Sequence, residues 1–341
     1  MRRIVSFLLT LIMAFSLSVG FAETRTPKPI DIIPYDEIAP VMDGQHHYLL
    51  LCVDQWKGQT RPEGPGPTQS DGKSRRDIYG NTDGIVLVTL DTRAHRIMLT
   101  SFIRDALVRK PNGNIGRINY IYNDFGPEEL CRVISQHINV KVENYILFDF
   151  TQIANIVDYL GGVDVDLNSS EISYLQRYAV PPGSVHSLET GRDLRSGGIH
   201  REGTYHFAGH SAVLYMRIRK AGGGGDFMRT QRARTVMSHL ADKCRDISWE
   251  EAEALVNNIM ENNTMTNVNL EGMLEAARYA YSLRDCTIEE LRLPPDSAAT
   301  PITFASMAVQ EIDWEICRQR MMNFLQTSFL VIDDEESDED F

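Results

Sequence analysis

The fold is decided by the stretch Asn81-Thr-Asp-Gly-Ile-Val-Leu-Val-Thr-Leu-Asp-Thr-Arg-Ala-His-Arg-Ile-Met-Leu-Thr-Ser-Phe102. Its apolar, β-branched segment Ile85–Leu90 is typical of a buried strand, and Arg96–Phe102 predicts a second strand after the polar turn at Asp91–Ala94. Earlier in the chain, Tyr48–Val53 has the same apolar character and predicts a further buried strand. These three strands indicate a sheet at the centre of the molecule.

The rest of the chain alternates between helical and strand patterns. Helices are expected at residues 128–138, 151–160, 249–262 and 270–283, and strands at 144–150, 163–167 and 289–293. Thr151 is the expected cap of its helix. A last ordered segment is expected at 314–329, and the polar stretch 171–203 suggests a flexible loop. This rhythm predicts an α/β (mixed α+β) fold in one domain, residues 47–330, with a central mixed β-sheet flanked by helices.

The two ends of the chain differ from the domain. Residues 1–22 begin with two arginines, continue as an apolar run and end in small residues, which predicts a signal peptide or a membrane anchor. The protein is therefore expected to be extracytoplasmic, either membrane-anchored or secreted at the cell surface. Residues 23–46 contain several prolines and predict a linker. Residues 331–341 are mostly acidic and predict a disordered tail.

Composition limits the classes of partner. The 341 residues are 43% hydrophobic, enough for a full core, and carry a formal net charge of −13. An acidic, exported chain is a poor candidate for nucleic-acid binding, which favours a basic face. The five cysteines are scattered without a Cys-x-x-Cys pair, so we expect small buried thiols with at most one disulfide.

A basic stretch, residues 215–234, stands out in this acidic chain. Alternation in Tyr215, Arg217 and Arg219 predicts a strand with both arginines on one face. Four glycines follow, and Asp226 is a plausible N-cap for a helix beginning at Phe227. Two further arginines, three residues apart on that helix, are expected to share a face near its N-terminal end.

This arrangement would aim several guanidinium groups at one volume beside free helix N–H groups. Arginine binds phosphate oxygens in a bidentate way, and helix N-termini favour negative charge. The stretch therefore indicates a site for a phosphate-bearing polyanion. The alternative is a solvated basic strip on the protein surface.

Seven motifs in order resemble those of the LytR-CpsA-Psr family of bacterial cell-wall proteins. They are Leu50–Asp54, Asn81–Asp83, Ser101–Asp105, Arg117–Asn119, Val157–Val163, Tyr215–Arg219 and Asp226–Arg232. The resemblance spans nearly all of the region from residue 47 to about 330. It implies a mixed sheet with helices around it and a hydrophobic groove that holds a polyprenyl chain.

By this resemblance the protein is expected to be a phosphotransferase. Family members move glycopolymers such as teichoic acid or capsular polysaccharide from a polyprenyl pyrophosphate carrier to peptidoglycan, near the membrane surface, with Mg²⁺ or Mn²⁺. A pyrophosphate needs its charge neutralised before a hydroxyl attacks phosphorus, which arginines and a metal ion achieve. Two alternatives stay open: a polyprenyl pyrophosphatase, and a non-catalytic protein that binds lipid or wall polymer.

The resemblance also implies roles for individual residues. The metal ligands are expected to be Asp54 and Asp83. The residues expected to contact the pyrophosphate are Arg104, Arg117, Arg217, Arg219, Arg229 and Arg232. The residues expected to be catalytic are Arg104, Arg217, Arg219 and Asp226. Sequence leaves open whether Asp226 or Asp105 accepts the hydroxyl proton, whether Asp226 is only a helix cap, and whether Arg104 is only a structural partner of Asp105.

Four positions depart from the family pattern. Asn81 stands where an arginine is usual, Arg117 replaces a lysine, Ala233 replaces a glutamine and Ile103 replaces a proline. Loss of one cation and one amide would weaken pyrophosphate binding or alter the acceptor. We therefore expect Ala233 to mark where this protein differs most from its relatives.

Overall fold

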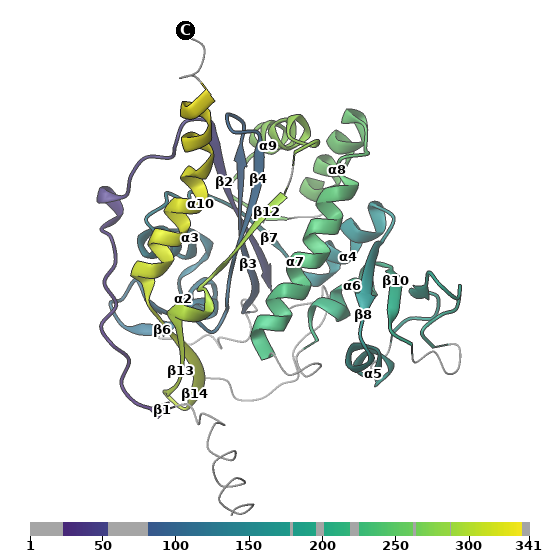
Figure 1. Cartoon of the computed structure of the whole chain (residues 1–341), viewed down its shortest axis with the longest axis horizontal. Coiled ribbons are helices and arrows are strands. Elements are labelled where there is room, and N and C mark those ends of the chain that lie inside the picture. The colour runs from purple at the N-terminus through teal and green to yellow at the C-terminus, as the bar shows by residue number, and fades with distance from the viewer. Residues whose placement is uncertain are drawn as a thin grey trace, which may run out of the picture.

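The structure is a computed structural model that describes residues 23–53, 81–177, 180–195, 201–218, 225–261, 264–286 and 288–335. Its centre is a six-stranded mixed sheet in the order β11-β7-β2-β3-β4-β12 (Figure 1). The strands are β2 (Gln45–Val53), β3 (Thr82–Asp91), β4 (Arg96–Phe102), β7 (Asn144–Phe148), β11 (Met265–Thr266) and β12 (Ile288–Leu293). The predicted central mixed sheet is therefore confirmed, and β4 has the bounds expected from the sequence.

Alternate side chains of β3 explain why helices cover both faces of this sheet. Ile85 and Leu87 point into the main core, where they meet α3 (Pro127–Ile138) and α10 (Trp314–Glu335). Val88 points the other way and packs with α9 (Leu270–Ser282). The period of two along a strand produces this division. In Figure 1 the sheet accordingly stands between α3 and α10 on one side and α7, α8 and α9 on the other.

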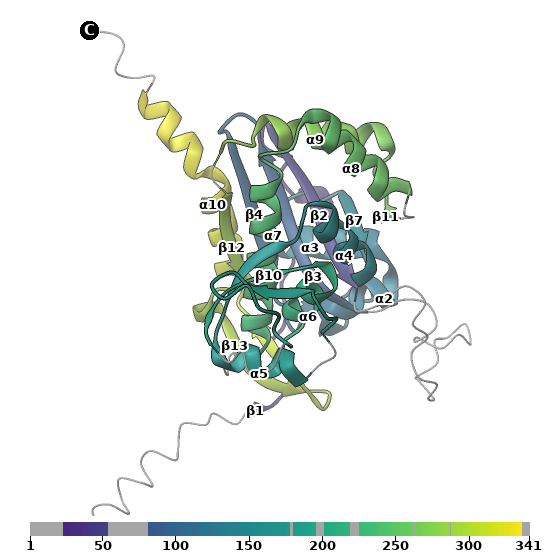
Figure 2. The same cartoon turned by 90° about the vertical axis from the view of Figure 1, so that its right-hand side faces the viewer.

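A second, smaller lobe lies beside the main sheet, at the right of Figure 1, and faces the viewer in Figure 2. Its sheet has the order β8-β10-β9, formed by Val163–Leu167, Gly203–Phe207 and Val185–Ser187. Around it pack α5 (Ser169–Arg177) and parts of α6 (Gly209–Met216) and α7 (Gly225–Lys243), which share one apolar cluster with the strands. The prediction of a flexible loop over 171–203 is thus wrong for its described residues, because α5 and β9 bury apolar side chains there.

The remaining helices and strands complete the fold. They are α4 (Phe150–Tyr159), α8 (Trp249–Glu261), α2 (Ile121–Phe125), the short strands β5 (Leu107–Arg109) and β6 (Ile115–Arg117), and the hairpin of β13 (Ala299–Phe304) and β14 (Met307–Ile312). The hairpin has no counterpart in the sequence prediction. Asp149, not Thr151, caps α4: its side chain accepts the Gln152 amide while the Gln152 side chain accepts the Asp149 amide.

The segment predicted as a linker packs on the domain. Its first strand, β1 (Glu23–Thr24), pairs in parallel with β13, and Ile30 lies in the main core. Arg25 forms an ion pair with Glu311 of β14. At the other end, α10 continues to Glu335, so the predicted disordered tail begins with helix over residues 331–335. The rest of that tail, and residues 1–22, lie outside the described residues.

Two further sequence expectations can be compared with the described residues. All five cysteines fall within them and are free thiols, three of them buried. No disulfide therefore stabilises this fold. None of the helices described is both long and apolar enough to cross a membrane.

Candidate active site

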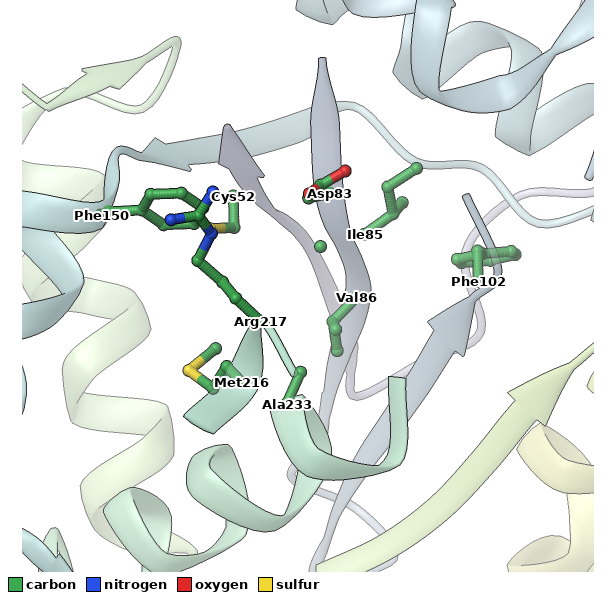
Figure 3. Close-up of a pocket in the computed structure, with 10 residues that line it drawn as sticks. Cys52, Asp83, Ile85, Val86, Phe102, Phe150, Met216, Arg217 and Ala233 are labelled. Carbon is green, nitrogen blue, oxygen red and sulfur yellow. The ribbon is translucent and has the colours of Figure 1, made fainter. Parts of the chain in front are cut away.

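A pocket opens between the start of β3 and the helices α4, α6 and α7 (Figure 3). It is open to solvent: the empty space between its walls is about 480 Å³ including that open solvent, and the part that can hold the centre of a water-sized molecule is about 40 Å³. Its wall is mostly apolar, but two charged side chains, Asp83 and Arg217, reach it from different parts of the chain. The pocket therefore joins the main sheet to the smaller lobe.

Asp83 is held at the pocket by the start of β3. Gly84 follows it at a point where the β2–β3 register shifts, and a Cβ on Gly84 would lie 3.0 Å from the Cβ of Cys52. Arg104 Nη1 donates to Asp83 Oδ1 over 2.7 Å, and the two side chains are only 17% and 9% exposed. Such a charge-assisted bond in a sheltered place fixes both groups.

Asp105 extends this pair into a row of alternating charges. Its Oδ2 lies 3.7 Å from Arg104 Nε, and its Oδ1 lies 3.1 Å from Arg117 Nη1. Arg117 also donates to the carbonyl oxygen of Ala308 in β14. The structure therefore brings together Asp83, Arg104 and Arg117, and Asp105 is the carboxylate that links the two arginines.

Arg217 enters the pocket from the end of α6. It is the C-terminal cap of that helix, and its guanidinium lies over the Phe150 ring with 4.5 Å from Cζ to the ring centroid. Figure 3 shows it extending over Phe150 near Cys52, with Asp83 across the pocket. A guanidinium that stacks on an aromatic face keeps its planar set of N–H donors, the geometry that matches phosphate oxygens.

The predicted strand over Tyr215–Arg219 is wrong. Residues up to Met216 belong to α6, and Arg217 and Ile218 follow as a helix end. The reason is tertiary packing: α6 lies so close to α4 that a Cβ on Gly209 would be 2.0 Å from the carbonyl oxygen of Ala154. The local alternation of polar and apolar residues carries no information about that contact between distant segments.

Arg232 does not reach the pocket. Its side chain is 2% exposed, and its Nε donates to Glu171 Oε1 over 2.6 Å inside the smaller lobe. The expectation that this guanidinium contacts a pyrophosphate directly is not supported by its position. Its neighbour Ala233 does line the pocket (Figure 3).

Four expected site residues cannot be placed as side chains. Asp54 and Arg219 lie outside the described residues, and Asp226 and Arg229 lie on α7 where only the backbone is described. Asp226 falls in the first turn of α7, which begins at Gly225. Its expected role as an N-cap before Phe227 therefore does not match the helix start.

The fit of a divalent metal depends on oxygen ligands at this pocket. Asp83 offers one carboxylate, and Mg²⁺ needs only one or two carboxylates when substrate oxygens and water complete its shell. Within the described residues no three His, Cys, Asp or Glu side chains form a metal-binding group. Val53, which precedes Asp54 in the chain, pairs with Thr82, which precedes Asp83. The donor chemistry fits a hard cation that is shared with a phosphate.

Several pocket residues were missed from the sequence. The sequence predicts Phe150 as the end of a strand, and it indicates no role for Met216 or Cys52 at the site. For Phe150 a signal existed: Asp149 and Gln152, three residues apart before an apolar run, form the capping-box pattern that starts a helix at residue 150. No comparable signal marked Met216.

The fold and pocket together define a class of α/β protein: a mixed sheet, covered by helices, with an acid–arginine row at the ends of its inner strands β3 and β4, beside an apolar pocket. The chain belongs to the LytR_cpsA_psr family, whose model matches residues 42–321. The resemblance noted in the sequence is thereby confirmed over most of the chain.

Two curated relatives illustrate the likeness. The polyisoprenyl-teichoic acid–peptidoglycan teichoic acid transferase TagV of Bacillus subtilis is 26% identical over 210 residues, 60% of this chain and 49% of that protein. TagU of Bacillus anthracis, named for the same transferase activity, is 25% identical over 225 residues, 65% of this chain and 66% of that protein. The chain thus spans between half and two thirds of the length of these relatives.

Solved structures support the fold. TagT bound to LIIa-WTA superposes with a TM-score of 0.60 at 19% identity, over 92% of this chain and 98% of that one. The crystal structure of B. subtilis TagV gives a TM-score of 0.58 at 19% identity, over 84% of this chain and 98% of that one. At this identity the likeness establishes the architecture.

Proposed function

We propose that this protein is an extracytoplasmic phosphotransferase that moves a glycopolymer from a polyprenyl pyrophosphate carrier to peptidoglycan. Membership of the LytR_cpsA_psr family and the transferase names of its relatives support this. The observation that carries the proposal is the pocket itself. There Arg217 and Asp83 reach the same apolar pocket from different sides, and Arg104 pairs with Asp83.

The pocket offers the contacts that such a carrier needs. Arg217 lies where it can neutralise pyrophosphate oxygens. Arg104 is hydrogen-bonded to Asp83, which lines the pocket. The apolar wall, including Ile85, Phe102 and Met216, suits the first units of a polyprenyl chain. A pyrophosphate lipid needs both kinds of surface next to each other.

In the reaction, a peptidoglycan hydroxyl oxygen forms a bond to the phosphorus that carries the glycopolymer. The bond from that phosphorus to the bridging oxygen breaks, polyprenyl phosphate leaves, and the hydroxyl proton passes to a base. Fixed guanidinium groups stabilise the negative charge that develops on the phosphate oxygens. Asp54 and Asp83 would hold Mg²⁺ or Mn²⁺, which neutralises the same oxygens as a Lewis acid when bound.

Arg104, Arg217, Arg219 and Arg229 are the residues proposed to bind the pyrophosphate. Arg117 is bound to Asp105 and to the Ala308 carbonyl oxygen. Its proposed role is to hold Asp105, and through it Arg104, in place. Asp105 lies between two guanidinium groups and is a less suitable proton acceptor than Asp226, because it is already shared by Arg104 and Arg117. We therefore assign the base to Asp226. The membrane surface is the place of the reaction, because the carrier lipid resides there.

A second candidate function has one observation in its favour. Asp83, a proposed metal ligand, is already neutralised by Arg104 at 2.7 Å. A protein that binds the lipid without transferring its glycopolymer would tolerate that pairing. The same pocket with water as acceptor would act as a polyprenyl pyrophosphatase.

One experiment separates these functions. The full chain, purified in detergent, is incubated with a polyprenyl pyrophosphate-linked glycopolymer and peptidoglycan, with Mg²⁺ or with a chelator. We expect transfer with Mg²⁺, and a loss of about 100-fold or more in Arg217→Ala, the typical effect of removing one donor to developing charge. Asp83→Ala should also lose transfer. Arg132→Ala is the control, because its side chain is 53% exposed on α3 and distant from the pocket.

The remaining outcomes choose between the alternatives. Release of phosphate without attachment to peptidoglycan identifies a pyrophosphatase. Lipid binding without turnover at any divalent metal concentration, in wild type and in Arg132→Ala alike, identifies the non-catalytic binding protein. Either result rejects the transferase.

A further inference from the structure

Arg232 is a charged side chain in an otherwise apolar core. It is 2% exposed and lies in the smaller lobe with Val236 and Tyr215. Its Nε donates to Glu171 Oε1 over 2.6 Å, and its Nη1 donates to the carbonyl oxygen of Ile218 over 2.9 Å. The guanidinium Cζ lies 6.0 Å from the centre of the Tyr215 ring. From α7 it therefore contacts two other segments of the chain, α5 and the C-terminal end of α6.

Glu171 is as tightly held as its partner. It is 4% exposed, and its second oxygen, Oε2, accepts the backbone N–H of Asn168 over 3.1 Å. The Asn168 side chain in turn accepts the backbone N–H of Glu171 at the start of α5. The carboxylate therefore has a fixed position, and it fixes Arg232 in turn.

Arg232 holds the chain on both sides of Arg217. Ile218, whose carbonyl oxygen it binds, directly follows Arg217, and Tyr215 precedes Arg217 by two residues. Burial, and then the nearby charge of Glu171, raises the pKa of Tyr215 to about 12, which shows how closely that ring shares the ion pair's surroundings. The turn that presents Arg217 to the pocket is thus attached to α5 and α7 through one guanidinium.

Stability alone does not account for such a pair. Moving two charges out of water is costly, and replacing a buried ion pair by apolar residues of similar size is often neutral or stabilising. An ion pair differs from an apolar pair in direction, because its hydrogen bonds specify angles as well as distances. Here one of these directed hydrogen bonds is accepted by the carbonyl oxygen of Ile218, the residue next to Arg217.

We propose that the buried Arg232–Glu171 pair is a positioning device that sets Arg217 over Phe150 at the mouth of the pocket. Arg232 is then a positioning residue, acting through Ile218, and does not touch substrate. This role rests on the proposed function, since it gives Arg217 its orientation toward the pyrophosphate. It also explains why an arginine in the family motif is directed away from the pocket.

The test compares two apolar replacements of ion pairs in the full chain. The first is Arg232→Met with Glu171→Leu. The matched control is Arg96→Met with Glu289→Leu, because Arg96 is 8% exposed and its Nη1 lies 3.0 Å from Glu289 Oε2 at the β4–β12 edge of the main sheet. Three quantities are measured: the melting temperature, backbone hydrogen exchange of residues 216–218, and the kcat and KM of transfer.

Positioning predicts a distinct pattern. In the Arg232/Glu171 double variant, amides 216–218 exchange at least about 10-fold faster while the melting temperature stays near that of wild type. Transfer falls by about 10- to 100-fold, mostly in kcat, because a displacement of about 1 Å can cost about 100-fold. The control variant keeps wild-type exchange at 216–218 and wild-type kcat.

Arg232→Lys keeps the proposal falsifiable if the double variant fails to fold. Lysine retains the charge beside Glu171 but lacks the planar fork that reaches two acceptors at once. Faster exchange at 216–218 with an unchanged melting temperature supports positioning. Wild-type exchange and wild-type kcat in either folded variant overturn it, and so does a kcat that falls only in proportion to melting temperature.

The two proposals fail separately. If wild-type protein transfers no glycopolymer, the proposed function is rejected, yet hydrogen exchange at 216–218 still reports whether Arg232 holds the Arg217 turn. If transfer is present but exchange and kcat are unchanged in the variants, the positioning role alone is rejected.

Discussion

The main sheet and the smaller lobe contribute to the same pocket in different ways. The main sheet has an apolar core built on the long strands β2 and β3, and it supplies Asp83 and Arg104. The smaller lobe has strands of three to five residues and a buried ion pair, and its side of the pocket supplies Arg217. On the main-sheet side an acid–arginine row stands on an apolar core, and on the other side a buried ion pair lies inside the smaller lobe itself.

This difference teaches where mutations should act on stability and where they should act on geometry. Loss of packing volume in the main core should affect the whole molecule. Changes in the smaller lobe should alter the free energy of its local unfolding and the position of the Arg217 side chain. Measurements of global stability and of local unfolding separate these two effects.

The largest effect is expected from a cavity in the main core. Leu87 is fully buried in β3, so Leu87→Ala should lower the free energy of unfolding by about 2–5 kcal/mol. Urea unfolding followed by circular dichroism measures this loss. Leu188→Ala is the control, because that side chain is 55% exposed and its loss should cost less than about 0.5 kcal/mol. Equal losses of unfolding free energy in Leu87→Ala and Leu188→Ala would contradict the expectation that core packing carries the stability.

Acid should weaken the main core through two buried histidines. Burial lowers the pKa of His47 and of His137 to about 4, from a usual value of 6.5. Below 6.5 the unfolded chain takes up protons that the folded core rejects, so stability falls as the pH drops from 6.5 toward 4. Each shift corresponds to about 3 kcal/mol.

Denaturant midpoints measured between pH 7 and pH 5 test this dependence, since few carboxylates titrate above pH 5. His137 Nε2 accepts the Arg109 amide and its Nδ1 lies 2.6 Å from the Val133 carbonyl oxygen, an arrangement that requires the neutral ring. His137→Gln should flatten the slope. A slope that is the same in the variant as in wild type would show that His137 is not its source.

The smaller lobe should open before the main sheet. Native-state hydrogen exchange is expected to give amides of β10, such as Tyr205 and Phe207, an opening free energy at least about 1.4 kcal/mol below those of Leu49 and Leu51 in β2. Shorter strands and a smaller apolar cluster are the reason. A single opening free energy for all four amides would mean that the two parts unfold as one unit.

The smallest effect on stability is expected at Ala233. Ala233→Gln places a longer polar side chain in the pocket wall, where it reduces the apolar volume beside Met216. We expect a change in stability below about 0.5 kcal/mol and a loss of a few-fold in affinity for a polyprenyl chain, measured by titration. Ala233→Ser keeps the volume and is the control. A gain in affinity with glutamine would show that the amide contributes a contact.

Much of the main sheet was predictable from the sequence, because its apolar strands have the period and length that burial requires. The strand at Arg96–Phe102 and the helix ending at Ile138 follow local patterns that the structure repeats. The α6 helix was not predictable from alternation around Tyr215, since its backbone is decided by close packing of Gly209 on Ala154.

The candidate site was predictable only in part. Asp83, Arg104 and Arg117 were expected from motifs, and the structure brings them together through Asp105. The burial of the Arg232 side chain in the smaller lobe could not be predicted, because its partner Glu171 lies 61 residues away in the chain. Long-range polar pairs leave no periodic pattern in a sequence.

The short strand β1 has a practical consequence. The family match starts at residue 42, but ordered contacts occur well before it: β1 pairs with Ile302 and Thr303 of β13, and Arg25 pairs with Glu311. A recombinant chain begun at residue 42 would leave that edge of β13 bare and Glu311 without its cation. Bare strand edges recruit other chains. Trimming this protein to its family boundary should therefore produce aggregates rather than a well-behaved minimal domain.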